Sequence, residues 1–260
     1  MKEVFTIRFR CILILWFYLV FHTNNSLAQN FDTCYQQGLR LELALNEKAA
    51  LLKFSEAQKL RPYNLEVLYK CSELCSRIGN RENNTQSRDR YFENALAFAK
   101  LAYQHYPYAD DANVAMSIAL GRIALTKSGK EKITTVRLIK QHAEKAIKAN
   151  PNNFKAWHIL GKWNYEVSNL SFIEKAATKI LYGGLPAASL HFAIEAYDKA
   201  RKLNPYFCLN YLELAKAYYS NNESNKAIAM LSLIPPIPNT TEDDLIIKKE
   251  ASLLMKKWTK

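Results

Sequence analysis

Apolar residues recur three and four positions apart along most of the chain, in long stretches rich in Ala, Leu, Lys and Glu. This spacing gathers them on one face of an α-helix, whereas the strict alternation typical of a half-buried strand is nearly absent. The pattern therefore predicts an all-α protein.

Four prolines mark a repeat within this helical pattern. Each follows an alanine by five residues, in the pairs Ala57 and Pro62, Ala102 and Pro107, Ala146 and Pro151, and Ala200 and Pro205. Three residues before these alanines lie Phe54, Ala99, Ala143 and Tyr197. The series A-x3-F-x2-A-x4-P is typical of the second helix of a tetratricopeptide repeat, where small residues allow close helix packing. Pro is expected to start the following helix after a tight turn.

First helices follow in phase with these second helices. Trp157, Leu160 and Gly161 occupy the W-x2-L-G positions after Pro151. The sequence thus predicts a single domain over residues 29–260, a tetratricopeptide-like right-handed superhelical solenoid. Its expected repeats are residues 31–64, 65–109, 110–153, 154–207 and 208–239, and a capping helix is expected over residues 240–258.

The intervals between the four prolines all exceed the standard period of about 34 residues, so each of these repeats carries an insertion. The insertions in the second and third repeats are polar, and either longer helices or exposed loops would explain them. The insertion in the fourth repeat places apolar residues on one helical face and ends at Gly183 and Gly184, which predicts an extra helix. That face consists of Phe172, Ile173, Ala176, Ala177, Ile180 and Leu181. It either packs back on the edge of the solenoid or contacts a partner or a membrane.

The same region carries a family resemblance. Residues 157–175 read W-H-x-L-G-x-W-x-Y-x-V-S-x-L-S-x-I-E-K. This segment resembles the regulator of microtubule dynamics family, and the likeness extends more weakly from Phe31 to Ala229. The resemblance implies a tetratricopeptide-like helical protein without known catalytic residues, of a family whose animal members look cytosolic, spindle-associated or mitochondrially anchored.

The N-terminal segment has a different character from the repeats. Lys2, Arg8 and Arg10 precede an apolar run over residues 11–21, and small residues follow at Ser26 and Ala28. The run is shorter than the roughly 20 residues that span a bilayer. Residues 1–28 are therefore predicted to be a signal peptide, with cleavage between Ala28 and Gln29 and export to the periplasm or cell envelope. The alternative is a short membrane anchor formed by residues 11–21, and membrane association is expected only in that case.

The sequence contains no motif that indicates catalysis or cofactor binding. The chain lacks the HExxH, GxSxG, P-loop and GxGxxG motifs, and its His residues show no metal-ligand spacing. We expect no enzyme activity, cofactor, metal site or small-molecule substrate. Nucleic acid is not expected as a partner of an exported chain, although the net charge of +12 alone would allow it. The disulfide status of Cys34, Cys71, Cys75 and Cys208 stays open, with a bridge from Cys34 to Cys71 or Cys75 as one possibility.

A partner groove is expected where the first helices line the concave face of the solenoid. The repeat register assigns to it Tyr69, Arg77, Arg122, Lys155, His158, Lys162, Tyr165, Lys216 and Tyr219. Cations interleaved with Tyr suit an acidic peptide or a C-terminal carboxylate, although a solvated basic face without a ligand is the other interpretation. The predicted function is a non-catalytic exported scaffold that binds a protein or peptide through this groove. The alternative is a membrane-anchored, cytosol-facing family member that binds microtubules.

Overall fold

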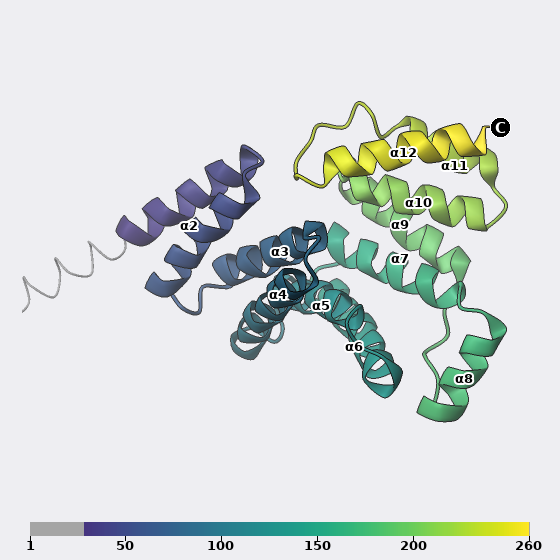
Figure 1. Ribbon diagram of the computed structural model, residues 1–260, viewed down its shortest axis with the longest axis horizontal. Helices are drawn as coiled ribbons and strands as arrows, with labels where there is room; N and C mark the ends of the chain where they lie inside the picture. The colour runs from purple at the N-terminus through teal and green to yellow at the C-terminus, as the bar shows by residue number, and fades with distance from the viewer. Residues whose placement is uncertain (1–28, 260) are drawn as a thin grey trace, which may run out of the picture.

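The computed structural model describes residues 29–259, and every regular element in this range is a helix (Figure 1). The helices form hairpins in chain order. Residues 29–43 pair with α2 (Glu47–Leu60), α3 (Leu65–Arg81) with α4 (Thr85–His105), α5 (Asp110–Ala124) with α6 (Gly129–Ala149), α7 (Phe154–Ser168) with α9 (Leu190–Leu203), and α10 (Cys208–Ser220) with α11 (Ser224–Ser232). The predicted all-α solenoid is confirmed, with α8 (Phe172–Tyr182) as its extra helix and α12 (Asp244–Trp258) packed on α10 and α11 as its cap.

Local sequence fixes where the helices begin. Asn46, Asn64, Asn84 and Asn153 cap α2, α3, α4 and α7 with their side chains. In α3, for example, Asn64 Oδ1 accepts the backbone N–H of Val67 at 3.0 Å, which satisfies one of the free donors of the first turn. The repeat prolines lie in the turns between hairpins, three positions before each first helix, instead of at its first residue as we expected.

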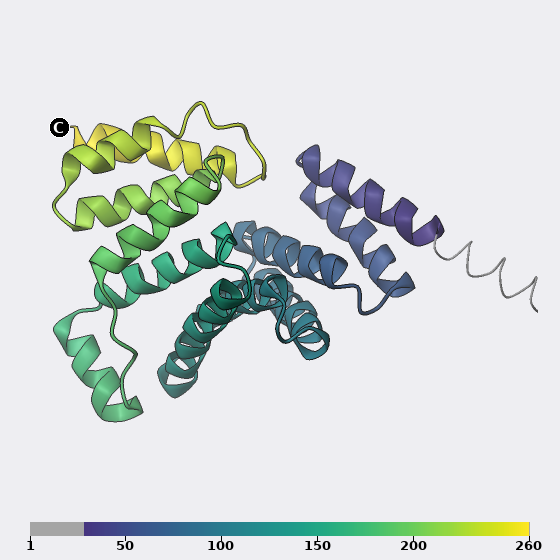
Figure 2. The same cartoon turned by 180° about the vertical axis from the view of Figure 1, so that it is seen from behind.

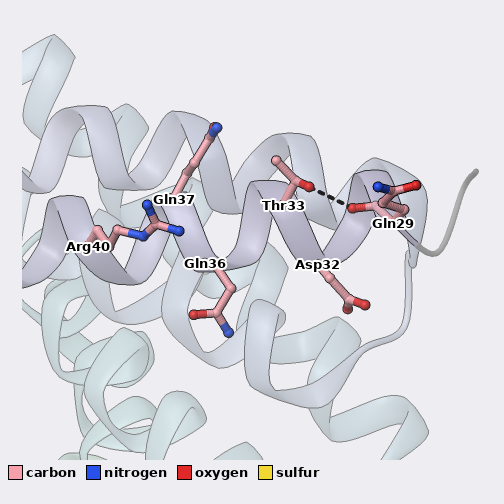
Figure 3. Close-up of a pocket in the computed structure, with 6 residues that line it drawn as sticks. All are labelled: Gln29, Asp32, Thr33, Gln36, Gln37 and Arg40. Atoms are coloured by element: carbon pink, nitrogen blue, oxygen red, sulfur yellow. Dashed lines mark hydrogen bonds between the residues drawn. The ribbon is translucent and has the colours of Figure 1, made fainter.

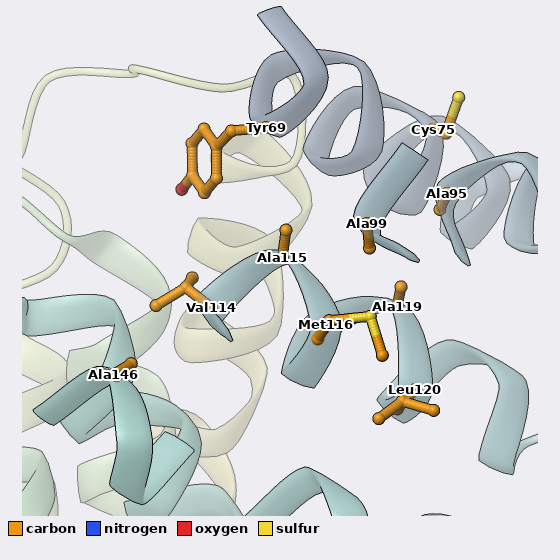
Figure 4. Packing of buried hydrophobic residues seen from close by; sticks show 11 residues of the cluster. Tyr69, Cys75, Ala95, Ala99, Val114, Ala115, Met116, Ala119, Leu120 and Ala146 are labelled. Atoms are coloured by element: carbon orange, nitrogen blue, oxygen red, sulfur yellow. The ribbon is translucent and has the colours of Figure 1, made fainter. Parts of the chain in front are cut away.

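Small residues allow the two helices of each hairpin to approach closely. Ala57, Ala102, Ala146 and Ala200 are all fully buried. A Cβ atom on Gly161 of α7 would lie 2.8 Å from the ring of Tyr197 in α9, a distance too short for real contacts. The same principle appears in a buried cluster that runs from α3 to α7 and includes Ala95, Ala99, Ala115 and Ala119 together with Met116 (Figure 4).

The polar insertions of the second and third repeats are helix extensions. Both α4 and α6 are 21 residues long, and the inserted residues form the turn before the second helix and its first turns. Of the two explanations that the sequence allowed, longer helices are therefore the correct one.

The two ends of the solenoid meet. The loop before α12 lies beside the turn before α2 (Figures 1 and 2). There, the backbone N–H of Glu47 donates to Glu242 Oε1 at 2.7 Å, and Arg81 at the end of α3 pairs with Glu47 at 2.6 Å, with Glu242 at 3.2 Å and with Asp243. These contacts, which we call the terminal clamp, join the first two repeats to the C-terminal cap.

Candidate functional site

Side chains from α3, α7 and α10 face one another on the inner side of the solenoid, which we call the concave wall. Lys155 of α7 donates to Tyr69 Oη at 2.6 Å and also to the carboxylate of Glu73, both in α3. These helices belong to repeats that are not adjacent along the chain. Such contacts require the first helices to converge, so the superhelix is tight at this point.

One end of the concave wall is a buried ion-pair network around Arg77. Its guanidinium lies 2.9 Å from Glu42, 3.0 Å from Glu47 and 3.3 Å from Glu73. Burial alone would raise the pKa of Glu73, but the charges of Lys155 and Arg77 outweigh it and hold that pKa at about 2. Glu73 is therefore ionised at neutral pH.

The other end of the concave wall is organised around Glu213 of α10. Its buried carboxylate accepts from Lys162 at 2.7 Å and from Lys216 at 3.2 Å. Each lysine has a second, more exposed partner, Glu166 at 2.8 Å for Lys162 and Glu250 at 2.8 Å for Lys216. Burial opposes the charge of Glu213, yet the two lysines lower its pKa.

The predicted aromatic and imidazole side chains at the Glu213 end of the concave wall also contact other residues of the chain. His158 is buried, with Nδ1 2.9 Å from Asn210 Oδ1, and burial lowers its pKa so that the ring is neutral. Tyr165 Oη lies 3.2 Å from Ser220 Oγ, and Tyr219 stacks on Trp258 of α12 with ring centroids 4.1 Å apart. His158 therefore joins α7 to α10 and is not available to a partner.

Arg122 of α5 stands apart from both ends. Its Nη1 donates to Asn80 Oδ1 at 2.8 Å, while its Nε is buried and lacks a hydrogen-bond partner among residues 29–259. Burial lowers the pKa of this guanidinium.

The predicted groove residues thus divide into two groups. Lys155, Lys162, Tyr165, Lys216 and Tyr219 keep part of their surface exposed, whereas Tyr69, Arg77, Arg122 and His158 are largely packed inside. The expectation of a freely basic groove needs correction, because every lysine of the set is paired with a glutamate. The concave wall is a ladder of alternating charges.

Sequence reasoning missed the carboxylates of this ladder. Glu73 precedes Arg77 by four residues on the same helix, a spacing that could have indicated the pair. Glu213 likewise precedes Lys216 by three residues on the same helix. Glu42, Glu47 and Glu250 gave no comparable signal, because their partners come from other helices.

Cysteine and metal chemistry find no support in the described residues. Cys34, Cys71, Cys75 and Cys208 are free thiols. Burial raises the pKa of both Cys71 and Cys75 to about 12, which disfavours the thiolate that a metal requires. No group of three or more His, Cys, Asp or Glu side chains between residues 29 and 259 is placed to hold a metal ion.

A shallow hollow on the helix of residues 29–43 is not a candidate site. All its lining residues come from one face of that single helix, and Thr33 donates to the carbonyl of Gln29 at 2.8 Å (Figure 3). The lining consists of Gln29, Asp32, Thr33, Gln36, Gln37 and Arg40. Nothing in this set converges on a common point as a binding site requires.

The predicted signal peptide or anchor, residues 1–28, lies outside the described residues. Among residues 29–259, no helix combines the length and the apolar character needed to cross a membrane.

Comparison with known proteins decides the family. The family model for regulator of microtubule dynamics protein 1-3 matches residues 27–259. The chain belongs to this family. It is 28% identical over 210 residues to regulator of microtubule dynamics protein 3 of Xenopus laevis, which covers 80% of this chain and 43% of that protein. It is 26% identical over 250 residues to protein 1 of Mus musculus, covering 92% of this chain and 81% of that protein.

The match to these members of the regulator of microtubule dynamics family covers only part of several of the relatives. The chain spans about half the length of the first relatives, 43% for the Xenopus laevis protein 3 and 56% for protein 2 of Rattus norvegicus.

Solved structures identify the fold as tetratricopeptide-like. A thermophilic tetratricopeptide-repeat protein of Thermus thermophilus superposes with a TM-score of 0.64 at 16% identity, over 86% of this chain and 99% of its own. Yeast Tom70 does so with a TM-score of 0.52 at 15% identity, over 89% of this chain and 41% of its own. At these identities the likeness shows the fold alone.

Proposed function

We propose that this chain is a non-catalytic scaffold that binds an extended, acidic segment of a protein partner along the concave wall. The observation that carries the proposal is the arrangement around Glu213. Lys162 and Lys216 share this buried carboxylate, and each has one further partner, Glu166 or Glu250, that is about half-exposed. Exposed ion pairs contribute little stability, so partner carboxylates can replace Glu166 and Glu250 at low cost.

The half-exposed rings of Tyr165 and Tyr219 suit this role. They lie beside the two lysines, on α7 and α10, and offer apolar area to a bound chain. The tetratricopeptide-like fold supports a protein partner, because stacked helix pairs form extended concave surfaces.

The experiment is site-specific photo-crosslinking in the native host. A photoreactive residue at Tyr165 should give a discrete protein adduct, whereas the same residue at the exposed Lys100 of α4 should not. The variant Lys162→Glu with Lys216→Glu should lose the adduct at unchanged helical content, measured by circular dichroism. Lys100→Glu with Lys148→Glu serves as the matched control on second helices. An adduct that persists in the first variant would contradict the proposal.

We further propose that the scaffold acts after export, with cleavage between Ala28 and Gln29. The basis is the short apolar run with a small-residue cleavage motif. The intact mass of the protein from its native host tests it, since a soluble species beginning at Gln29 is expected outside the cytoplasm. A membrane-bound species that retains Met1 would exclude export.

Family membership favours one second function. A member that keeps residues 1–28 as an anchor and faces the cytosol would use the concave wall on the acidic tails of tubulin. Cosedimentation with microtubules tests this reading, and binding that disappears when the tubulin tails are removed by protease would support it. Microtubules that leave the protein in the supernatant would exclude it.

A further inference from the structure

Helix α8 presents its apolar face to solvent. Phe172 is 85% exposed, Ile173 79%, Ile180 81% and Leu181 65%, and no residue of the helix is buried. At roughly 100° per residue these four side chains fall within about half of the helix circumference. Both views show α8 standing at an outer corner of the molecule (Figures 1 and 2).

The orientation of α8 is fixed by contacts on its polar side and at its ends. Arg137 of α6 donates through Nε to the carbonyl of Gly184 at 3.0 Å and through Nη2 to the carbonyl of Tyr182. Lys175 donates to the carbonyl of Ser168 at 2.8 Å. A capping box of Ser171 and Glu174 closes the N-terminus. The helix is therefore held against α6 with its apolar face outward, and that face does not pack back on the solenoid.

Positive charge flanks one edge of this apolar face. Lys175 and Lys179 lie on α8 itself, and both are exposed. The start of α6 is adjacent, because a Cβ atom on Gly129 would lie 3.3 Å from Tyr182 Oη. That start adds the exposed residues Lys127, Lys130 and Lys132. Within α8 and residues 127–132 the only carboxylates are Glu131 and Glu174.

We propose that α8 and the start of α6 form a docking surface for an anionic lipid bilayer. A helix with Phe, Ile and Leu on one face and flanking lysines lies in the plane of the membrane, with its apolar side chains at the acyl boundary. The lysines then meet the negative surface potential of the headgroups. A neutral protein groove would gain nothing from these exposed lysines, and a second copy of this chain would bring two patches of net positive charge together. This inference does not depend on the concave wall.

Vesicle flotation tests the proposal with the protein from Gln29 onward. Vesicles of phosphatidylcholine containing about 30% phosphatidylserine should carry the protein to the top of the gradient, and pure phosphatidylcholine vesicles should not. Ile173→Ser with Ile180→Ser should weaken binding about tenfold or more, because the buried apolar area is lost. Lys130→Glu with Lys179→Glu should do the same, since neither side chain has a hydrogen-bond or ion-pair partner between residues 29 and 259.

The matched control is Leu43→Ser with Leu52→Ser. These residues are 84% and 67% exposed in the first hairpin, so the change removes similar apolar surface far along the chain from α8. This variant should float like the unmodified protein, and circular dichroism should show equal helical content in all variants. Absence of flotation with anionic vesicles would overturn the proposal, as would equal flotation of the Ile173→Ser, Ile180→Ser variant. So would a dimer, detected by light scattering, that the same variant dissociates, because a second copy would then cover the face.

Discussion

The concave wall and α8 differ in whether their charged and large apolar side chains have partners within the protein. Along the concave wall, buried charges have partners, as with Arg77 among three glutamates and Glu213 between two lysines. On α8, four large apolar side chains have none and lie in solvent. Charged groups that are paired within the chain hold the helices together. An exposed apolar face contributes little to folding stability until something binds it. This difference distinguishes residues that stabilise the solenoid from residues that are free to bind another molecule.

The largest effect is expected from Tyr197→Ala, inside the hairpin from which α8 emerges. Tyr197 is fully buried against Gly161, so the cavity should lower the free energy of unfolding by about 4 kcal/mol. Tyr197→Phe is the control. Its Oη is buried without a hydrogen-bond partner in the described chain, so its removal should leave stability equal or higher in urea denaturation. A small loss for Tyr197→Ala would mean that this hairpin is as loosely packed as α8.

Breaking the terminal clamp should come next. Glu47→Ala removes a fully buried carboxylate and leaves Arg77 and Arg81 with fewer partners, so the free energy of unfolding should fall by about 3 kcal/mol. Lys48→Ala is the neighbouring control, because Lys48 is largely exposed and its pair with Glu82 is worth less than about 1 kcal/mol. Equal losses in chemical denaturation would show that burial of the clamp carries no special weight.

Acid should weaken the concave wall. The folded pKa of Glu73 is about 2, below the value of about 4.3 expected for an unfolded chain. The unfolded state therefore binds more protons between these values, and stability falls as the pH drops from about 5 to about 2, by an amount on the order of 3 kcal/mol. Glu73→Gln should flatten this part of the stability profile measured by thermal unfolding. An unchanged profile would contradict the assignment.

A smaller effect is expected from removing the hydrogen bonds that hold the C-terminal end of α8. Arg137→Ala removes the donor to the carbonyls of Tyr182 and Gly184 and should reduce global stability by about 1 kcal/mol or less. Hydrogen exchange should accelerate within residues 172–182 and stay unchanged in α7 and α9. Lys132→Ala on the same helix is the control. Exchange that accelerates throughout the fourth repeat would show that α8 is part of the core.

The smallest effect is expected from Phe172→Ala. The side chain is largely in solvent, so the free energy of unfolding should change by no more than about 0.5 kcal/mol. A loss close to that of Tyr197→Ala in the same denaturation assay would show that α8 buries its apolar face within the monomer.

Much of the fold could be predicted because its determinants are local. The alanine and proline series places small residues at fixed spacing, and the observed burial of Ala57, Ala102, Ala146 and Ala200 is what close helix packing requires. The extra helix was likewise predictable from its apolar stripe and from Gly183, which adopts the left-handed conformation with φ of 76°. The prediction failed only at the repeat prolines, which lie before the helices instead of starting them.

The candidate site was much less predictable. The register placed Lys155 and Lys162 on first helices, but not the glutamates that neutralise them, because Glu73 is 82 positions from Lys155 and Glu213 is 51 positions from Lys162. Such pairs depend on superhelical curvature, which no short motif encodes. Amphipathicity predicted that α8 has an apolar face, yet it could not tell whether the protein itself covers that face.

The terminal clamp fixes the number of helical hairpins that the solenoid can contain. An open stack of helical hairpins can gain or lose a member at either end, since each member touches only its neighbours. Here Glu47 is bonded to Glu242 across 195 positions of sequence, which ties the beginning to the end. One hairpin more or fewer would misplace that meeting point, so the architecture permits a single length, and forming the contact requires most of the chain to be in place first.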